Sequence, residues 1–292
     1  MLGRRRIVVM TIERSMWTLF EPLHGVTYFA PEAREHFEAV GLRGFWRGYF
    51  AGRAAPLGAV DAAPVIAAFF GFAPAMVRRA LPDVWTRAAP DAVLAARQAG
   101  AVAALSRLLK AASTSDIGVA VDLLTEAAAH VDVGGRVLAA ANVALPAPTE
   151  PTARLWHATT ILREHRGDGH VAALVLWGLD GCEALVWRSS LDLSGDVLRA
   201  ARGWTDDEWA SAADRLRAKG WIDDDGRATT IAQDALRDIE AATDRAARRP
   251  WSALGARATE RLIATLTPLA IAARSEIPDV NPIGLPRPRL SG

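Results

Sequence analysis

The stretch TDDEWASAADRLRAKGWIDDDGR, residues 205–227, decides the fold. Its first part predicts an amphipathic helix over 205–219 that ends at Gly220. Apolar side chains recur there at i, i+4 and i+7: Trp209, Ala213 and Leu216. The run Asp223-Asp-Asp-Gly-Arg227 predicts a polar turn between two short strands, and a last long helix follows over 230–248.

The residues before this stretch predict further helices. A helix over 152–166 is followed by a break at Gly167-Asp-Gly169 and by a short apolar helix over 170–179. Another helix lies near 182–190, and a turn surrounds Gly203-Trp204. The order helix, helix, helix, hairpin, helix is typical of a winged helix-turn-helix.

Glycine and proline divide the first half into short helices, expected at about 14–24, 31–40, 44–52, 61–70, 74–81, 91–111, 115–130 and 135–143. Three prolines in Leu145-Pro-Ala-Pro-Thr-Glu-Pro151 then favour an extended connector. We therefore expect a mainly α protein, with a helical N-terminal domain (10–144) packed on a winged helix-turn-helix-like C-terminal domain (152–270) that has one small β-hairpin, and an extended or disordered tail (271–292). A weak likeness between 69–77 and 176–184 raises the hypothesis that the two domains are diverged copies.

Composition excludes several classes of protein. The 34 Lys and Arg nearly balance the 33 Asp and Glu, so neither half has the charge of a polyanion-binding domain. No apolar run reaches the roughly 18 to 20 residues of a membrane-spanning helix, and we expect no membrane partner. Cys182 is the only cysteine, which fits a reducing compartment, and the short apolar run after Arg4-Arg5-Arg6 is no export signal. We expect a cytoplasmic protein.

Two stretches resemble a known class of regulators. The run 161–174, ILREHRGDGHVAAL, and the run 215–222, RLRAKGWI, together with the long final helix, look like MarR-type winged-helix proteins. With 17–29 and 41–53 added, the chain is similar to an actinobacterial helix-turn-helix family labelled SalK-like, over residues 14 to about 270. This resemblance implies the fold and carries no activity.

The start of the expected recognition helix argues against DNA binding. Asp206, Asp207 and Glu208 would face the phosphate charges of a duplex, and no nearby basic cluster offsets them. A structural reason is sufficient for these acids, because Thr205 and Glu208 match a capping box and the helix dipole favours acids in a first turn. DNA is therefore an unlikely partner, and the fold is expected to serve as a scaffold.

A group of histidines is the first candidate for chemistry: His157, His165, Asp168 and His170. Such side chains are suitable metal ligands, but their spacing is not a standard ligand motif, and we predict no metal site. Asp168 is also placed to cap a helix that begins at His170. The chain has no nucleotide-binding glycine loop, so no cofactor is expected.

Aromatic and basic side chains of the first half form the second candidate. The positions expected to bind a ligand are Trp17, Phe20, Tyr28, Trp46, Arg47, Tyr49, Phe50 and Arg53, with His170 from the second half. The competing interpretation is that these aromatics are core residues. Gly44, Gly48 and Gly52, four apart, favour tight helix packing over a ligand approach.

These features lead to one main hypothesis and two competing ones. The first is binding of a hydrophobic or aromatic small molecule in a pocket between the two halves. In its enzymatic form this is cofactor-independent acid–base chemistry of specialised metabolism, with His24, His157, His165 and Asp168 as proton-transfer groups. The second is a ligand-responsive MarR-like DNA-binding regulator, a homodimer through the helices at 152–166 and 230–248. The third is a protein-interaction module with an exposed apolar patch.

Overall fold

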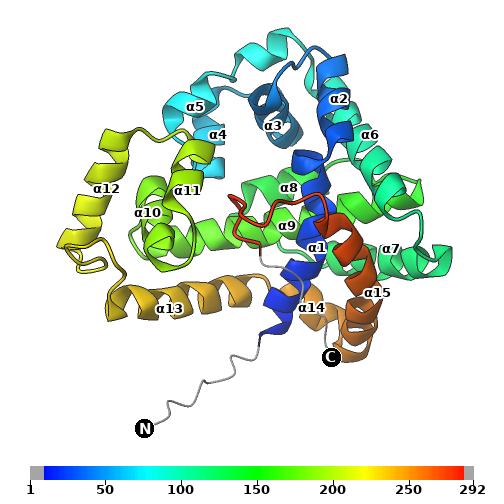
Figure 1. Ribbon diagram of the computed structural model, residues 1–292. Helices are drawn as coiled ribbons and strands as arrows, with labels where there is room; N and C mark the ends of the chain where they lie inside the picture. Colours follow the sequence, from blue (N-terminus) through cyan, green and yellow to red (C-terminus); the bar gives the residue numbers. More distant parts are fainter. Residues whose placement is uncertain (1–9, 286–292) are drawn as a thin grey trace.

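The structure is a computed structural model that describes residues 10–285. Its first half contains the eight predicted helices (Figure 1). The first helix is longer than predicted, because Thr11 caps its start by accepting a hydrogen bond from Arg14 N, and because Pro22 does not interrupt it. The elements are α1 (Ile12–Phe29), α2 (Pro31–Ala39), α3 (Phe45–Ala54), η1 (Ala55–Leu57), α4 (Ala62–Phe69), α5 (Pro74–Arg78), η2 (Asp83–Thr86), α6 (Pro90–Leu108), α7 (Thr114–Ala129) and α8 (Val137–Val143).

The helix after the proline-rich connector has no break. Helix α9 runs without interruption over Pro151–Leu176, so the predicted break at Gly167-Asp-Gly169 and the separate helix after it are wrong. A Cβ at Gly169 would lie 2.9 Å from Ala246 and 2.7 Å from Arg136 Nη1. This glycine therefore lets another helix and an arginine approach α9 closely, and it does not end the helix.

Asp168 has a different role from the predicted cap of a following helix. Its side chain is buried within α9, and its Oδ2 accepts hydrogen bonds from Leu138 N and Ala139 N, each at 2.9 Å. These two amides open α8, where N–H groups lack partners inside the helix. Asp168 thus caps a helix that precedes it in sequence by thirty residues.

Four helices of the second half follow α9. They are α10 (Gly181–Leu191), α11 (Gly195–Arg202), α12 (Asp206–Ala218) and α13 (Thr230–Ala246), with α13 at the lower left of Figure 1. The capping box at Thr205 and Glu208 is present as predicted. The predicted β-hairpin is wrong, since the described residues form only one antiparallel bridge, Ile222 to Ala228, and no strand. The five residues of the acidic turn close on themselves instead, because Asp223 N donates to Arg227 O at 2.9 Å.

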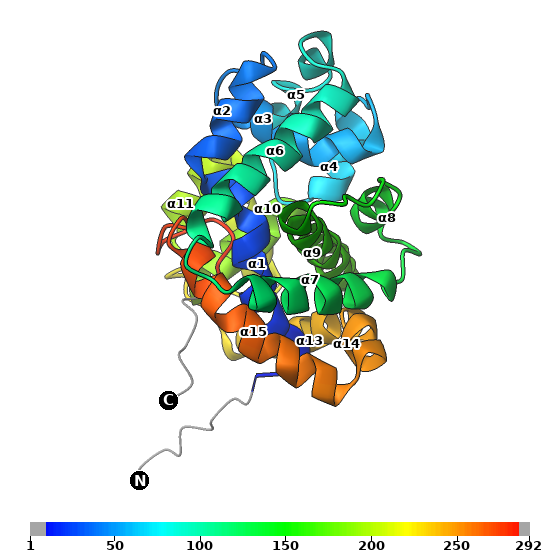
Figure 2. The ribbon, with the colours of Figure 1, turned by 90° about the vertical axis from the view of Figure 1, so that its right-hand side faces the viewer.

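The chain ends with two helices that return to the first half. α14 (Arg249–Leu254) and α15 (Ala256–Arg274) pack on α7, and α15 also packs along α1 (Figure 2). The helix therefore continues past residue 271, where the tail was predicted to begin. In the tail, Ile277, Asn281 and Leu285 are buried; residues 286–292 lie outside the described part.

Helix α9 lies at the centre of the packing and contacts α1, α6, α7, α8 and α13. One apolar core joins α1, α6, α7, α9, α14 and α15, so it draws side chains from both sides of the connector at 145–151. A second core joins α3, α4, α5 and α6 and includes Phe37 of α2 and Leu138 of α8. A third joins the end of α9 to α10, α12 and α13. The domain boundary and the idea of two diverged copies remain predictions.

Two of the three glycines predicted for tight packing, Gly48 and Gly52, are used in this way, whereas a Cβ at Gly44 would meet nothing within 4 Å. A Cβ at Gly52 would lie 2.5 Å from the ring of Phe37, and one at Gly48 would lie 2.9 Å from it. The ring of Phe37, from α2, therefore rests directly on the backbone of α3.

No single helix among residues 10–285 has the length and apolar character to cross a membrane. The bent pair of α9 and α10 meets these two criteria only when both helices are taken together.

Candidate functional site: a cavity between the two halves

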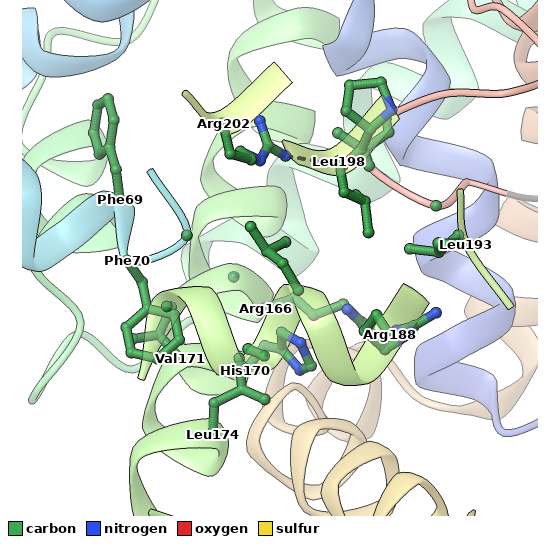
Figure 3. A pocket seen from close by; sticks show the side chains of 18 of the residues that line it. Phe69, Phe70, Arg166, His170, Val171, Leu174, Arg188, Leu193, Leu198 and Arg202 are labelled. Carbon is green, nitrogen blue, oxygen red and sulfur yellow. Dashed lines mark hydrogen bonds between the residues drawn. The ribbon is translucent and has the colours of Figure 1, made fainter. Parts of the chain in front are cut away.

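A cavity of about 550 Å³ lies where the two halves of the chain meet. Helices α1, α9, α10, α11 and α13 contribute to its walls, together with the loop after α4 and the tail at 282–284 (Figure 3). This volume is in the range of cavities that hold small organic molecules. Of the predicted ligand-binding residues, the cavity brings together Trp17, Tyr49, Arg53 and His170.

One wall of the cavity is aromatic. Phe69, Phe70 and Phe72 come from the end of α4 and the following loop, and the ring centroids of Tyr49 and Phe72 are 5.4 Å apart. Phe70 has a φ of 48°, a backbone conformation that a bulky residue rarely adopts. Its carbonyl oxygen leaves no room for a Cβ at Gly181, so the start of α10 is pressed against this loop.

Arginine side chains lie over these rings. The guanidinium of Arg53 is 4.3 Å from the ring centroid of Phe69, and that of Arg202 is 4.5 Å from the centroid of Phe72. Cations over aromatic faces are held by the quadrupole of the ring. The cavity therefore combines flat apolar surfaces with fixed positive charges.

A buried ion-pair network underlies the first-half side of the cavity. Glu164 is 2% exposed and accepts hydrogen bonds from Arg53 Nε (3.0 Å), Arg53 Nη2 (3.1 Å) and Arg163 Nη1 (2.7 Å). Burial opposes its ionisation, but Arg163 and Arg53 hold the pKa of Glu164 well below its usual value. Glu21 lies 3.6 Å from Arg163 and accepts a hydrogen bond from the Trp17 indole.

A second network lies on the side of α13. Arg14 contacts Glu240 at 3.0 Å and Asp244 at 2.9 Å, and Arg166 contacts Glu240 at 3.3 Å. Arg188 of α10 binds Asp192 at 2.8 Å. Burial alone would raise the pKa of Glu240, but these arginines and His170 together lower it below its usual value. The carboxyl therefore remains ionised.

The predicted histidine cluster does not converge. His165 is buried and binds Asp132 Oδ1 through Nε2 at 2.8 Å, on the other side of α9 from the cavity. His170 lines the cavity, and its Nδ1 lies 2.9 Å from Thr243 Oγ1. Burial lowers the pKa of His170 to about 4 and raises the pKa of Asp168 to about 6. In the described part of the chain, no three His, Cys, Asp or Glu side chains are grouped as metal ligands.

The other two proton-transfer candidates also lie away from the cavity. His24 is buried between Thr160 Oγ1 and Tyr28 OH, each at 3.0 Å, and lines only a void of about 10 Å³. Burial lowers its pKa well below the usual value. His157 is half-buried, and burial lowers its pKa to about 4. Only Asp168 of the four predicted proton-transfer residues is part of the cavity wall.

Several predicted ligand-binding residues belong to the core or the surface. Phe20 and Phe50 are fully buried in two different cores, and Trp46 packs against the second. Arg47 is exposed and donates to Arg43 O. For the three aromatic positions the core interpretation is the better one.

Sequence reasoning missed many of the wall residues, including Arg163, Arg166 and Arg202. A signal for two of them was present: Arg163, Arg166 and His170 are spaced i, i+3 and i+7, which places them on one helix face. The predicted break at Gly167 concealed this stripe.

The start of the predicted recognition helix is acidic in the structure as well. Asp206, Asp207 and Glu208 are all exposed at the start of α12, and Glu208 accepts from the Thr205 amide. The acids of the following turn, 223–225, are exposed as well.

The fold and these helices define a helical protein that carries a helix-turn-helix. Residues 13–278 match a family described as a helix-turn-helix family, and because the match covers most of the chain, the protein belongs to it. No curated protein and no solved structure matches the chain.

Proposed function

We propose that the protein binds a hydrophobic, aromatic small molecule in the cavity between its two halves, with the helix-turn-helix serving as a scaffold. The observation that carries this proposal is the cavity of about 550 Å³ with aromatic rings and arginines on its walls. A planar ligand between Phe69, Phe72 and Tyr49 would bury apolar area on several sides.

The proposal concerns binding and not acid–base catalysis. His24, His157 and His165 lie outside the cavity, so they cannot share a substrate with Asp168. Asp168 itself is committed to two backbone amides of α8. His170 is the one histidine that a bound molecule would touch.

A cavity-filling variant tests the proposal. Val171→Trp adds a large side chain to the wall, whereas Val175→Trp places the same side chain one turn along α9 at a position that is 58% exposed and outside the cavity. Native mass spectrometry of the freshly purified proteins, followed by thermal-shift screening of aromatic compounds, should detect binding to the wild type and to Val175→Trp but not to Val171→Trp. Equal binding by both variants would place the ligand elsewhere.

A second candidate is the ligand-responsive DNA-binding regulator, favoured by the helix-turn-helix family to which the chain belongs. It predicts a salt-dependent affinity for duplex DNA, because phosphate contacts release counterions. A fluorescence-polarisation titration with mixed-sequence duplexes at two salt concentrations measures this. The exposed acids at the start of α12 lead us to expect no binding.

A further inference from the structure

Most charged side chains around the cavity form ion pairs with one another, and Asp168 of the wall accepts hydrogen bonds from two backbone amides instead. Arg53 and Arg163 are matched by Glu164 and Glu21. Arg14, Arg166 and Arg188 are matched by Glu240, Asp244 and Asp192, and Arg237 at the rim pairs with Asp234. Arg202 is different, since within residues 10–285 no carboxylate forms an ion pair with it.

Arg202 is nevertheless held in a fixed position. It is the last residue of α11; its Nη2 donates to Pro282 O at 2.9 Å, and its guanidinium lies over Phe72. The backbone is fixed as well, because Arg202 O accepts from Ala73 N at 2.9 Å. Neither partner supplies a negative charge. Figure 3 shows the side chain pointing into the space between α9, α11 and the loop that carries Phe69.

The electrostatic surroundings make this charge costly. Burial lowers the pKa of Arg202, and the nearby cations Arg53 and Arg163 lower it further. A guanidinium remains charged under all ordinary conditions, so Arg202 stays cationic and without a carboxylate partner at neutral pH. A bound anion would supply that partner.

We infer that the ligand of the cavity is an aromatic acid with a single negative charge, a carboxylate that pairs with Arg202 while its ring lies against Phe72 and Phe69. This inference rests on the proposed function and adds the chemical class of the ligand. A guanidinium presents two parallel N–H groups to a carboxylate, and the hydrogen bond to Pro282 leaves donors available for such a pair. A second negative charge on the ligand would find no arginine without a carboxylate partner, since the other arginines named above are already paired.

Isothermal titration calorimetry with 2-naphthoate and its neutral isostere 2-naphthamide tests the inference. The wild-type protein should bind the acid at least about tenfold more tightly than the amide, because hydrogen bonds to charged groups are stronger than neutral ones. Arg202→Met should abolish that preference and leave the affinity for the amide unchanged. Arg202→Lys, which keeps the charge, should retain part of it.

Arg237→Met is the matched control, because this arginine also borders the cavity but already has Asp234 as its partner. It should leave the preference for the acid intact. Equal affinity of the wild type for acid and amide would overturn the inference while leaving the cavity-binding proposal in place. Binding of neither compound would overturn the inference. The proposed function would fail separately if Val171→Trp bound every compound of the screen as tightly as the wild type does.

Discussion

Replacing Glu164 by glutamine should be among the most destabilising single changes in this protein. The carboxylate is 2% exposed and is the shared partner of Arg53 and Arg163, whose side chains are 10% and 15% exposed. Glu164→Gln keeps the shape but leaves two guanidiniums with only Glu21, at 3.6 Å from Arg163, as a nearby carboxylate. Removing one member of a buried ion pair costs about 3–5 kcal/mol, because the remaining charge stays desolvated.

Urea unfolding followed by circular dichroism at neutral pH measures this loss. The matched control is Asp83→Asn, which removes the partner of Arg87 in a pair whose side chains are 50% and 43% exposed. Exposed pairs of this kind contribute only about 0–1 kcal/mol. A loss below about 1 kcal/mol for Glu164→Gln, or one equal to that of the control, would refute the idea that the network under the cavity depends on this carboxylate.

Three further outcomes are expected. Gly52→Ala should destabilise the protein by about 1–3 kcal/mol in thermal or urea unfolding, since its Cβ would enter the ring of Phe37. Gly118→Ala in α7, where a Cβ meets nothing within 4 Å, should instead stabilise the protein by about 0.5–1 kcal/mol. Changes of the same sign in both variants would contradict this expectation. Asp168→Ala should cost about 0.5–2 kcal/mol and increase amide exchange at the start of α8, because the cap is lost. The pKa values of His157 and His170 in the folded protein, about 4, lie below the ordinary 6.5, so the unfolded state takes up protons first on acidification. The free energy of unfolding should therefore fall by up to about 1.4 kcal/mol per pH unit for each histidine as the pH drops from 6.5 towards 4. In His170→Gln, urea unfolding at several pH values should show a smaller fall.

Local patterns were sufficient to predict most helices. The apolar stripe of α12 and its capping box at Thr205 depend on residues within one helix, so the local sequence is sufficient to predict both. The predicted hairpin was wrong because a turn pattern does not determine the length of the strands beside it. Asp223-Asp-Asp-Gly-Arg227 does form a tight turn, but the flanking residues pair at a single bridge before α13 begins.

The largest error in the site came from treating two glycines as a helix break. With a break at Gly167, His165 and His170 could point to a common centre. In the continuous α9 they are five residues apart, which at about 100° per residue places them about 140° apart around the axis. Gly169 is explained by the close approach of Ala246, a contact 77 positions away that no local rule includes.

The aromatic wall could not be predicted for a different reason. Phe69, Phe70 and Phe72 follow one another at the end of a short helix, where neither helical nor strand spacing assigns them a face. Their directions are set by the positive φ of Phe70 and by α10 pressing on its carbonyl. Such a conformation is maintained only when the surrounding structure imposes it.

The loop after α4 also holds the turn between α11 and α12 in place. The Trp204 indole donates to Gly71 O at 3.0 Å, and Arg202 O accepts from Ala73 N, so the turn between α11 and α12 is fastened to the first half of the chain. Leu198 and Arg202 of α11 therefore line the cavity, whereas Asp196 and Ala200 of the same helix are exposed. The acids of α12 lie at the opposite, exposed end of that turn, where they cap their own helix. Under the proposed function, this attachment lets α11 contribute Arg202 to the ligand site.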